Sequence, residues 1–266
     1  MAVFTGCSED GLLASLGAGT KINPGRSRMR LPSAVDKTPA LIIGYSGLLA
    51  AVAGFVNAVA ILILAFPVGN LTASTTKLGM NAANPLLYHS CVLALIIIGF
   101  LGGATAAGAV LAAARSHSGP RHAIVLVCEA VLLVMAIVIP EHTVATLLAA
   151  GACGLQNGAT SSLRGMAVRT THFTGTITDL GLLLGRSRHH GIDRAKAVVL
   201  TTTIASFLLG SAIGTVLGAR IGDAAFLVPA AICVTVALVG LTFHRRQAPP
   251  TSDRRRVVAA AEANTA

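Results

Sequence analysis

The sequence contains one pattern twice: Ala53-Gly54-Phe55-Val56-Asn57-Ala58 is followed by Val68-Gly69-Asn70-Leu71-Thr72, and Cys153-Gly154-Leu155-Gln156-Asn157-Gly158 by Thr174-Gly175-Thr176-Ile177-Thr178. Each copy lies within an otherwise apolar part of the chain. In membrane proteins, a pair of glycine-interrupted polar segments at matching places in two halves is the best sequence indication of a central site. The pattern therefore predicts an internal repeat and the place of a site, and leaves the ligand undefined.

The composition is that of an integral membrane protein. Apolar residues make up 54% of the 266 residues and charged residues only 11%, whereas about a quarter of a soluble domain is charged. Apolar stretches long enough for a spanning helix, about 17 to 25 residues, occur near residues 41–66, 88–114, 123–140, 143–163, 195–219 and 224–243. We therefore expect an all-α membrane protein with six transmembrane helices.

The net charge of +10 gives the orientation. Basic residues concentrate in both tails and in the second and fourth connections between the apolar stretches, and the other three connections hold few. By the positive-inside rule, both termini are cytoplasmic. We expect residues 1–38 and 244–266 to be disordered cytoplasmic tails around a transmembrane domain at 39–243. No basic helix with interleaved aromatic residues is present, so we expect no nucleic-acid partner.

The sequence offers little for catalysis or metal binding. The five cysteines are isolated from one another, which is typical of small buried residues. Gly44-Tyr45-Ser46-Gly47 matches the Gly-x-Ser-Gly of rhomboid proteases, but no histidine lies deep in a later span to activate the serine. We therefore expect neither an enzyme nor a cofactor or metal site.

The two halves match beyond the first pattern. Ten residues separate Gly69 from Gly79, and ten separate Gly175 from Gly185. In the next helix, Gly99, Gly103 and Ala107 match Gly210, Gly214 and Gly218, and such stripes of small residues allow close helix packing or a homo-oligomer. Repeat one covers about 41–140 and repeat two about 143–243. Each contains three spans, so the second enters the bilayer in the opposite sense, as an inverted 3+3 repeat.

Two short segments interrupt this pattern, Gly69–Met80 and Thr174–Arg186. Each holds about twelve residues, too few to cross a hydrocarbon core of roughly 30 Å as a helix. We expect re-entrant or broken half-helices whose non-helical starts face the protein interior. If these segments instead span the bilayer, each half has four helices and the repeat becomes parallel.

Several polar residues are candidates for the central site. Amides inside apolar stretches need partners, because an unsatisfied polar group costs several kcal/mol there. They either hold helices together or bind a solute near the midplane, with the half-helix N-termini supplying free N–H groups. The candidate binding residues are Asn57, Gly69, Asn70, Thr72, Gln156, Asn157, Thr174, Gly175 and Thr176. His172 lies where the chain enters the second half-helix and is a candidate for the entrance.

Two acidic residues are candidates for proton or ion coupling. Glu129 is the only acid deep inside an apolar span, and an intramembrane acid is a functional hypothesis by default. The alternative is a neutral, hydrogen-bonded side chain that ties helices together. Asp179 lies on the second half-helix, one turn after Gly175.

Gly154–Asn157, Arg169–Thr176 and Gly69–Thr72 together resemble motifs of the YoaK family of bacterial membrane proteins, also called domain of unknown function 1275. The resemblance extends over about Leu41 to Phe243. It implies a bacterial inner-membrane protein and no established substrate. The family usually has Thr-Gly-Asn in the first half and Asp at the position of Asn57, so Val68 and Asn57 depart from its pattern.

Two functions fit these observations. The first is a transporter or channel for a small polar solute or ion, with a midplane site at the repeat interface and rocking of one half against the other. The second is a membrane scaffold, sensor or partner-binding protein in which the amides only hold helices together.

Overall fold

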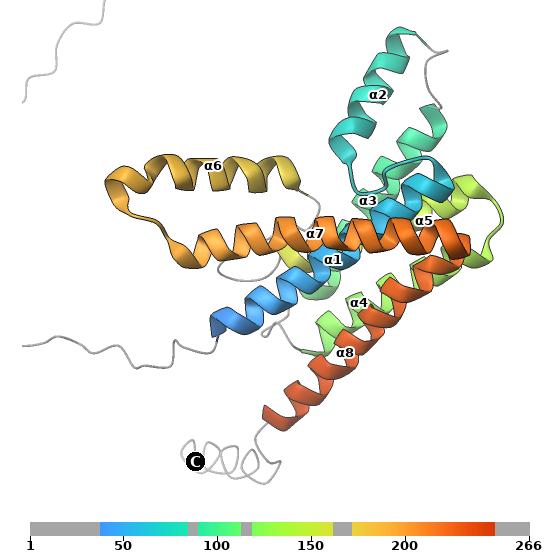
Figure 1. Cartoon of the computed structure of the whole chain (residues 1–266). Helices are drawn as coiled ribbons and strands as arrows, with labels where there is room; N and C mark the ends of the chain where they lie inside the picture. Colours follow the sequence, from blue (N-terminus) through green and yellow to red (C-terminus); the bar gives the residue numbers. More distant parts are fainter. Residues whose placement is uncertain (1–37, 85–89, 113–118, 162–171, 248–266) are drawn as a thin grey trace, which may run out of the picture. The chain divides into compact units, whose positions relative to one another are not determined.

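Helices and short connections form the described chain, and none of its described residues is in a strand. The computed structural model describes residues 38–84, 90–112, 119–161 and 172–247, so residues 1–37 and 248–266, which hold nearly all of the predicted tails, lie outside it. The elements are α1 (Thr38–Leu64), α2 (Leu71–Ala83), α3 (Ser90–Leu111), α4 (Pro120–Val138), α5 (His142–Ser161), α6 (Phe173–His190), α7 (Arg194–Ile221), the 3-10 helix η1 (Gly222–Phe226) and α8 (Leu227–Gln247) (Figure 1). The predicted all-α class is confirmed for these residues.

Within the described ranges, four helical segments are long and apolar enough to cross a membrane: Ile43–Leu64, Ser90–Leu111, Pro120–Val138 and Arg194–Arg246. The last contains α7, η1 and α8, and the chain turns back at η1 (Figure 1). Gly222 makes this turn with a φ of 63°, a conformation that glycine adopts without strain. The predicted fourth span, α5, is not among the four, because Gln156 and Asn157 lower its apolarity.

Large apolar side chains point outward from the long helices. Ile98 and Leu101 of α3 are 59% and 64% exposed, and Leu238 of α8 is 58% exposed. Such a surface is unfavourable in water and favourable against lipid tails. The described chain is therefore a membrane protein, as its composition predicts.

The helices pack in exchanged pairs. The two most extensive contacts join α1 with α7 and α3 with α5. The first span of each predicted repeat (α1 or α5) thus packs against the second span of the other repeat (α7 or α3). Further contacts join α1 with α5 and α4 with α8, which are equivalent helices of the two halves. The halves are therefore interleaved within one bundle.

Glycines allow the backbones of the paired helices to touch. A Cβ added to Gly103 of α3 would lie 2.0 Å from the carbonyl oxygen of Gly151 in α5, and one on Gly210 of α7 would lie 2.0 Å from that of Ala51 in α1. The reciprocal positions are equally tight, because a Cβ on Gly154 or Gly54 would also meet backbone atoms of the partner helix. Only glycine fits at these crossings.

These contacts correct the predicted register of the small-residue stripes by one helical turn. Since Gly103 faces Gly151 and Gly210 faces Ala51, Gly103 is equivalent to Gly210 rather than to Gly214. A stripe that repeats every four residues aligns equally well after a shift of one turn, so the sequence could not resolve this register. In the corrected register Phe100 matches Phe207.

The same contacts bear on the predicted homo-oligomer. Gly103, Gly210 and Gly214 face helices of their own chain, so these glycines are not open to a second copy. Gly102 and Gly108 of α3 have open space around them. Association of two chains stays a prediction, but these stripe glycines no longer support it.

The two predicted half-helices are α2 and α6. They have 13 and 18 residues, or about 20 and 27 Å at 1.5 Å per residue. α2 packs against α3 and α6 against α7. α6 begins at Phe173 and extends to His190, beyond the predicted Arg186, and it stops at Gly191, whose φ is 73°. α8 likewise continues to Gln247, past the predicted boundary at residue 243.

Candidate functional site

A polar cavity of about 330 Å³ lies where the two short helices begin. Its walls come from the end of α1, the start of α2, the start of α6, and α3, α5 and α7. The lining residues are Asn57, Gly69, Asn70, Leu71, Thr72, Phe100, Asn157, His172, Phe173, Thr174 and Phe207. Most of the candidate residues are thus brought together from segments more than one hundred residues apart.

Six of the nine candidate binding residues line this cavity, and His172 joins them as expected. The other three, Gln156, Gly175 and Thr176, are not part of the lining. Their side chains have other contacts, described below. The structure thus gathers the candidates in one place, and their role in binding stays a prediction.

The first side of the cavity joins the end of α1 to the start of α2. The Gly69 N–H donates a hydrogen bond to Oδ1 of Asn57, at 3.0 Å. Asn70 is the N-cap of α2, and its Oδ1 accepts from the Ala73 N–H at 3.2 Å, a common way to satisfy one of the free donors of a helix N-terminus. Asn57 and Asn70 therefore hold the non-helical chain in place beside the cavity.

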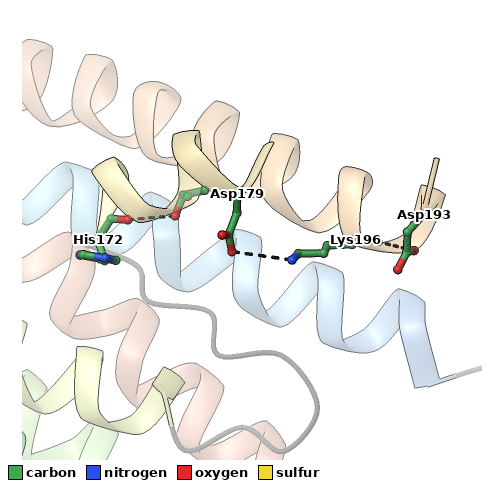
Figure 2. Close-up of polar contacts among 5 residues, drawn as sticks. His172, Asp179, Asp193 and Lys196 are labelled. Carbon is green, nitrogen blue, oxygen red and sulfur yellow. Dashed lines mark hydrogen bonds and ion pairs between the residues drawn. The ribbon is translucent and has the colours of Figure 1, made fainter. Parts of the chain in front are cut away.

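The second side is the start of α6. His172 is the N-cap, and its carbonyl oxygen accepts from the N–H of Thr176 at 3.1 Å and from the Thr176 hydroxyl at 3.0 Å (Figure 2). The His172 side chain makes no capping hydrogen bond. Its ring lies over the first turn instead, because a Cβ added to Gly175 would be 2.4 Å from Nε2. Gly175 therefore makes room for the imidazole.

This contact explains why Gly175 and Thr176 depart from the prediction. The sequence comparison placed the helix start at Thr174-Gly175, by analogy with Gly69. The structure places the cap at His172, so Gly175 and Thr176 fall inside the first turn of α6. The absence of a side chain at Gly175 leaves this space to the His172 ring.

The two sides of the cavity are related position by position. The caps Asn70 and His172 correspond, and each is followed by two residues of the lining, Leu71-Thr72 and Phe173-Thr174. Asn57 corresponds to Asn157 in the doubled pattern, and Phe100 corresponds to Phe207 in the corrected register. Equivalent elements of the two halves thus build the cavity.

Sequence reasoning missed the aromatic residues of the lining. Phe173 and Phe207 stack with their ring centroids 4.2 Å apart and their planes tilted by 55°. Phe100 lies on α3, in the corresponding place to Phe207. Phenylalanines in apolar helices resemble ordinary packing residues, and only the corrected register pairs Phe100 with Phe207.

Gln156 holds two helices together. Its Nε2 donates to the carbonyl oxygen of Leu49 in α1 at 2.8 Å, and the side chain is 1% exposed. This is the first of the two roles expected for the intramembrane amides. The neighbouring Asn157 lies in the cavity wall, so two adjacent amides of one motif have different surroundings.

Asp179 lies away from the cavity lining. Its carboxylate pairs with Nζ of Lys196 on α7 at 3.8 Å, and the two side chains are 53% and 46% exposed (Figure 2). Asp193 caps α7 nearby by accepting from the Lys196 N–H at 3.1 Å. Asp179 thus ties α6 to α7 at the surface, and its predicted coupling role stays a prediction.

Glu129 also lies outside the cavity lining, but it is buried, with 1% of its surface exposed. Cys233 of α8, Tyr45 of α1 and Cys153 of α5 are close enough to its carboxyl group to interact with it. Its Oε2 has no hydrogen-bond partner among the described residues. Among all described residues, no group of three or more His, Cys, Asp or Glu side chains is arranged to hold a metal ion.

Long apolar helices that enclose a polar cavity define a polytopic α-helical membrane protein. Residues 46–239 match the family model DUF1275, a protein of unknown function, so the chain belongs to that family. Neither the curated proteins nor the solved structures include a match.

Proposed function

We propose that this protein transports or conducts a small polar solute and that the cavity is its solute site. The observation that carries the proposal is the cavity itself, which lies at the start of two short helices and is built from equivalent positions of both halves. In transporters with repeats, binding sites form where discontinuous helices of the two halves meet.

Six spans in an inverted repeat agree with this arrangement. α7 and α8 are separate helices that meet at η1, and α5 packs between the spans α3 and α4. With α1, α3 and α4 they make three spans in each half, and an odd number reverses the second copy. The exchanged pairing of α1 with α7 and α3 with α5 is what a two-fold relation between the halves produces. Cytoplasmic termini and a bacterial inner membrane complete the proposal.

The lining indicates the chemistry of the solute. Among the described residues it contains three asparagines, two threonines and one histidine, and none of the described lining residues is Asp, Glu, Lys or Arg. The backbone N–H groups of Leu71 and Thr72 have no acceptor among the described residues. A volume of about 330 Å³ is near the lower end of ligand pockets, about 300 to 1,000 Å³. A small solute rich in hydrogen-bond acceptors fits these walls.

The moving parts would be the exchanged pairs of helices. Backbone contacts at Gly54 and Gly210 join α1 to α7, and those at Gly103 and Gly154 join α3 to α5. Rocking of one repeat against the other would break both sets of contacts. Alternating access therefore occurs by motion of the α1–α7 pair against the α3–α5 pair, with α2 and α6 carried by α3 and α7.

A binding screen tests the proposal. The detergent-purified protein is heated with inorganic anions, amino acids and small metabolites, because a ligand of the folded state raises its stability by RT ln(1 + [L]/Kd). A true solute stabilises the wild type and the control Asn84→Ala, whose residue lies outside the lining, and fails to stabilise Asn157→Ala. Its flux into proteoliposomes follows the same pattern.

The opposite result would favour the scaffold or sensor. If no compound stabilises well-folded protein, or if a compound stabilises Asn157→Ala as well as the wild type, the cavity is not the binding site. A compound that binds at the cavity without flux would identify a sensor.

A further inference from the structure

A second buried polar group lies apart from the cavity. Glu129 of α4 is surrounded by α1, α5 and α8, which bring Tyr45, Cys153 and Cys233 toward it. The Tyr45 hydroxyl, like Oε2 of Glu129, is buried and has no hydrogen-bond partner among the described residues. Two unsatisfied oxygens in one apolar interface are costly, and each needs an explanation.

The surroundings decide the charge of the Glu129 carboxyl. The described residues that interact with it are a phenol and two thiols, and no lysine or arginine forms an ion pair with it. The other buried titratable group of α4, His122, lies about two turns away along the helix. A bare carboxylate beside one phenol and two thiols is strongly disfavoured in such a place. The carboxyl is therefore protonated when the helices pack as they do here.

We propose that Glu129 is a proton-binding site and that loss of its proton separates α4 from α8. In this step the carboxyl O–H bond breaks and the proton passes to water that enters between the helices. The remaining carboxylate needs hydrogen-bond donors, which the entering water, the Tyr45 hydroxyl and the Cys233 thiol supply. When the proton returns, the carboxyl is neutral and the dry interface closes.

The site is linked to the cavity through α5. Cys153, beside Glu129, and Asn157, in the cavity wall, are one helical turn apart on this helix, and Gln156 ties the same turn to α1 through Leu49. Movement at α4 and α8 therefore reaches the wall that carries Asn157. Its use in transport rests on the proposed function, whereas the proton site itself does not.

Infrared spectroscopy of the solute-free protein tests the proton. A protonated carboxyl absorbs above the amide bands, and a carboxylate absorbs below them. The difference between wild type and Glu129→Gln at neutral pH should contain the carboxylic-acid band, and Cys233→Ala should shift this band because the thiol beside the carboxyl group is lost. If the wild type shows no acid band at neutral pH, the proposal is wrong, whatever the fold of the two variants.

Thiol labelling tests the opening. Cys233 and Cys153 are buried, and the same protein unfolded at each pH gives the reference for the effect of pH on thiol reactivity. As the pH rises, labelling of Cys233 in the folded protein relative to the unfolded protein should increase several-fold in the wild type and stay constant in Glu129→Gln. An equal increase in both proteins, or none in the wild type, would overturn the switch. Neither experiment depends on the cavity. A negative result in either one would therefore overturn the proton site without overturning the proposed solute site, which the binding screen tests.

Discussion

Gly103→Ala and Gly102→Ala place the same methyl group on neighbouring residues of α3 and should have opposite effects. At Gly103 the new Cβ would lie 2.0 Å from the Gly151 carbonyl oxygen, about 1 Å closer than the shortest approach that Cβ atoms make. Because the obstacle is backbone, α3 and α5 must move apart, and such overpacking costs about 1 to 3 kcal/mol. At Gly102 the space is open, and alanine gains up to about 1 kcal/mol of helix propensity.

Because both variants gain the same helix propensity, they should differ by the overpacking cost alone, roughly 1 to 3 kcal/mol in stability. The chain has no tryptophan, so thermal unfolding in detergent is followed with a fluorogenic thiol reagent that reports exposure of the buried Cys153 and Cys233. Gly103→Ala should melt below the wild type and Gly102→Ala at or above it. Equal melting temperatures, or the reverse order, would refute the contact between α3 and α5 and with it the exchanged pairing.

Three further variants test other parts of the structure. Gly210→Ala should destabilise the protein about as much as Gly103→Ala, because each crowds an equivalent backbone crossing; a harmless Gly210→Ala would contradict the two-fold relation. Gln156→Leu removes the donor to the Leu49 carbonyl and should lower the stability measured by thermal unfolding by about 1 to 3 kcal/mol. The Kd of a screened solute should stay unchanged; a changed Kd with normal stability would place Gln156 in the solute site. Asp179→Asn breaks a half-exposed ion pair and should cost less than about 1 kcal/mol, with an effect that salt reduces; a larger loss that salt does not change would show that the pair does more than tie α6 to α7.

The candidate site illustrates how far a repeat can be read from sequence. Asn57 and Asn157 occupy equal places in two copies of a pattern, and equal places in a two-fold arrangement can meet at the axis. The sequence therefore predicted that Asn57, Asn70, Asn157 and Thr174 lie near one another, and they line one cavity. The membrane class was easier to predict, because the composition alone excludes a soluble domain.

Neighbouring residues within the motif could not be separated in the same way. Gln156 and Asn157 are adjacent amides, and successive residues of a helix point about 100° apart. Which one faces a cavity and which faces another helix depends on the rotation of α5 against α1 and α3. The structure directs Gln156 to Leu49 and Asn157 to the cavity.

The sequence by itself determined the helical membrane class, the doubled pattern and the region of the cavity, because these depend on composition and local pattern. It also predicted a separate helix after the first span of each half, but α6 has 18 residues rather than about twelve. Only the tertiary structure decided which helices pair and that Phe100 is equivalent to Phe207. It also showed that the His172 ring lies over Gly175, and that Glu129 is buried while Asp179 is at the surface. A stripe of small residues every four positions aligns equally well after a shift of one helical turn, and the sequence around an acid does not show whether its side chain is buried. The helix register and the burial of an acid depend on contacts between residues far apart in the chain, which only the tertiary structure shows.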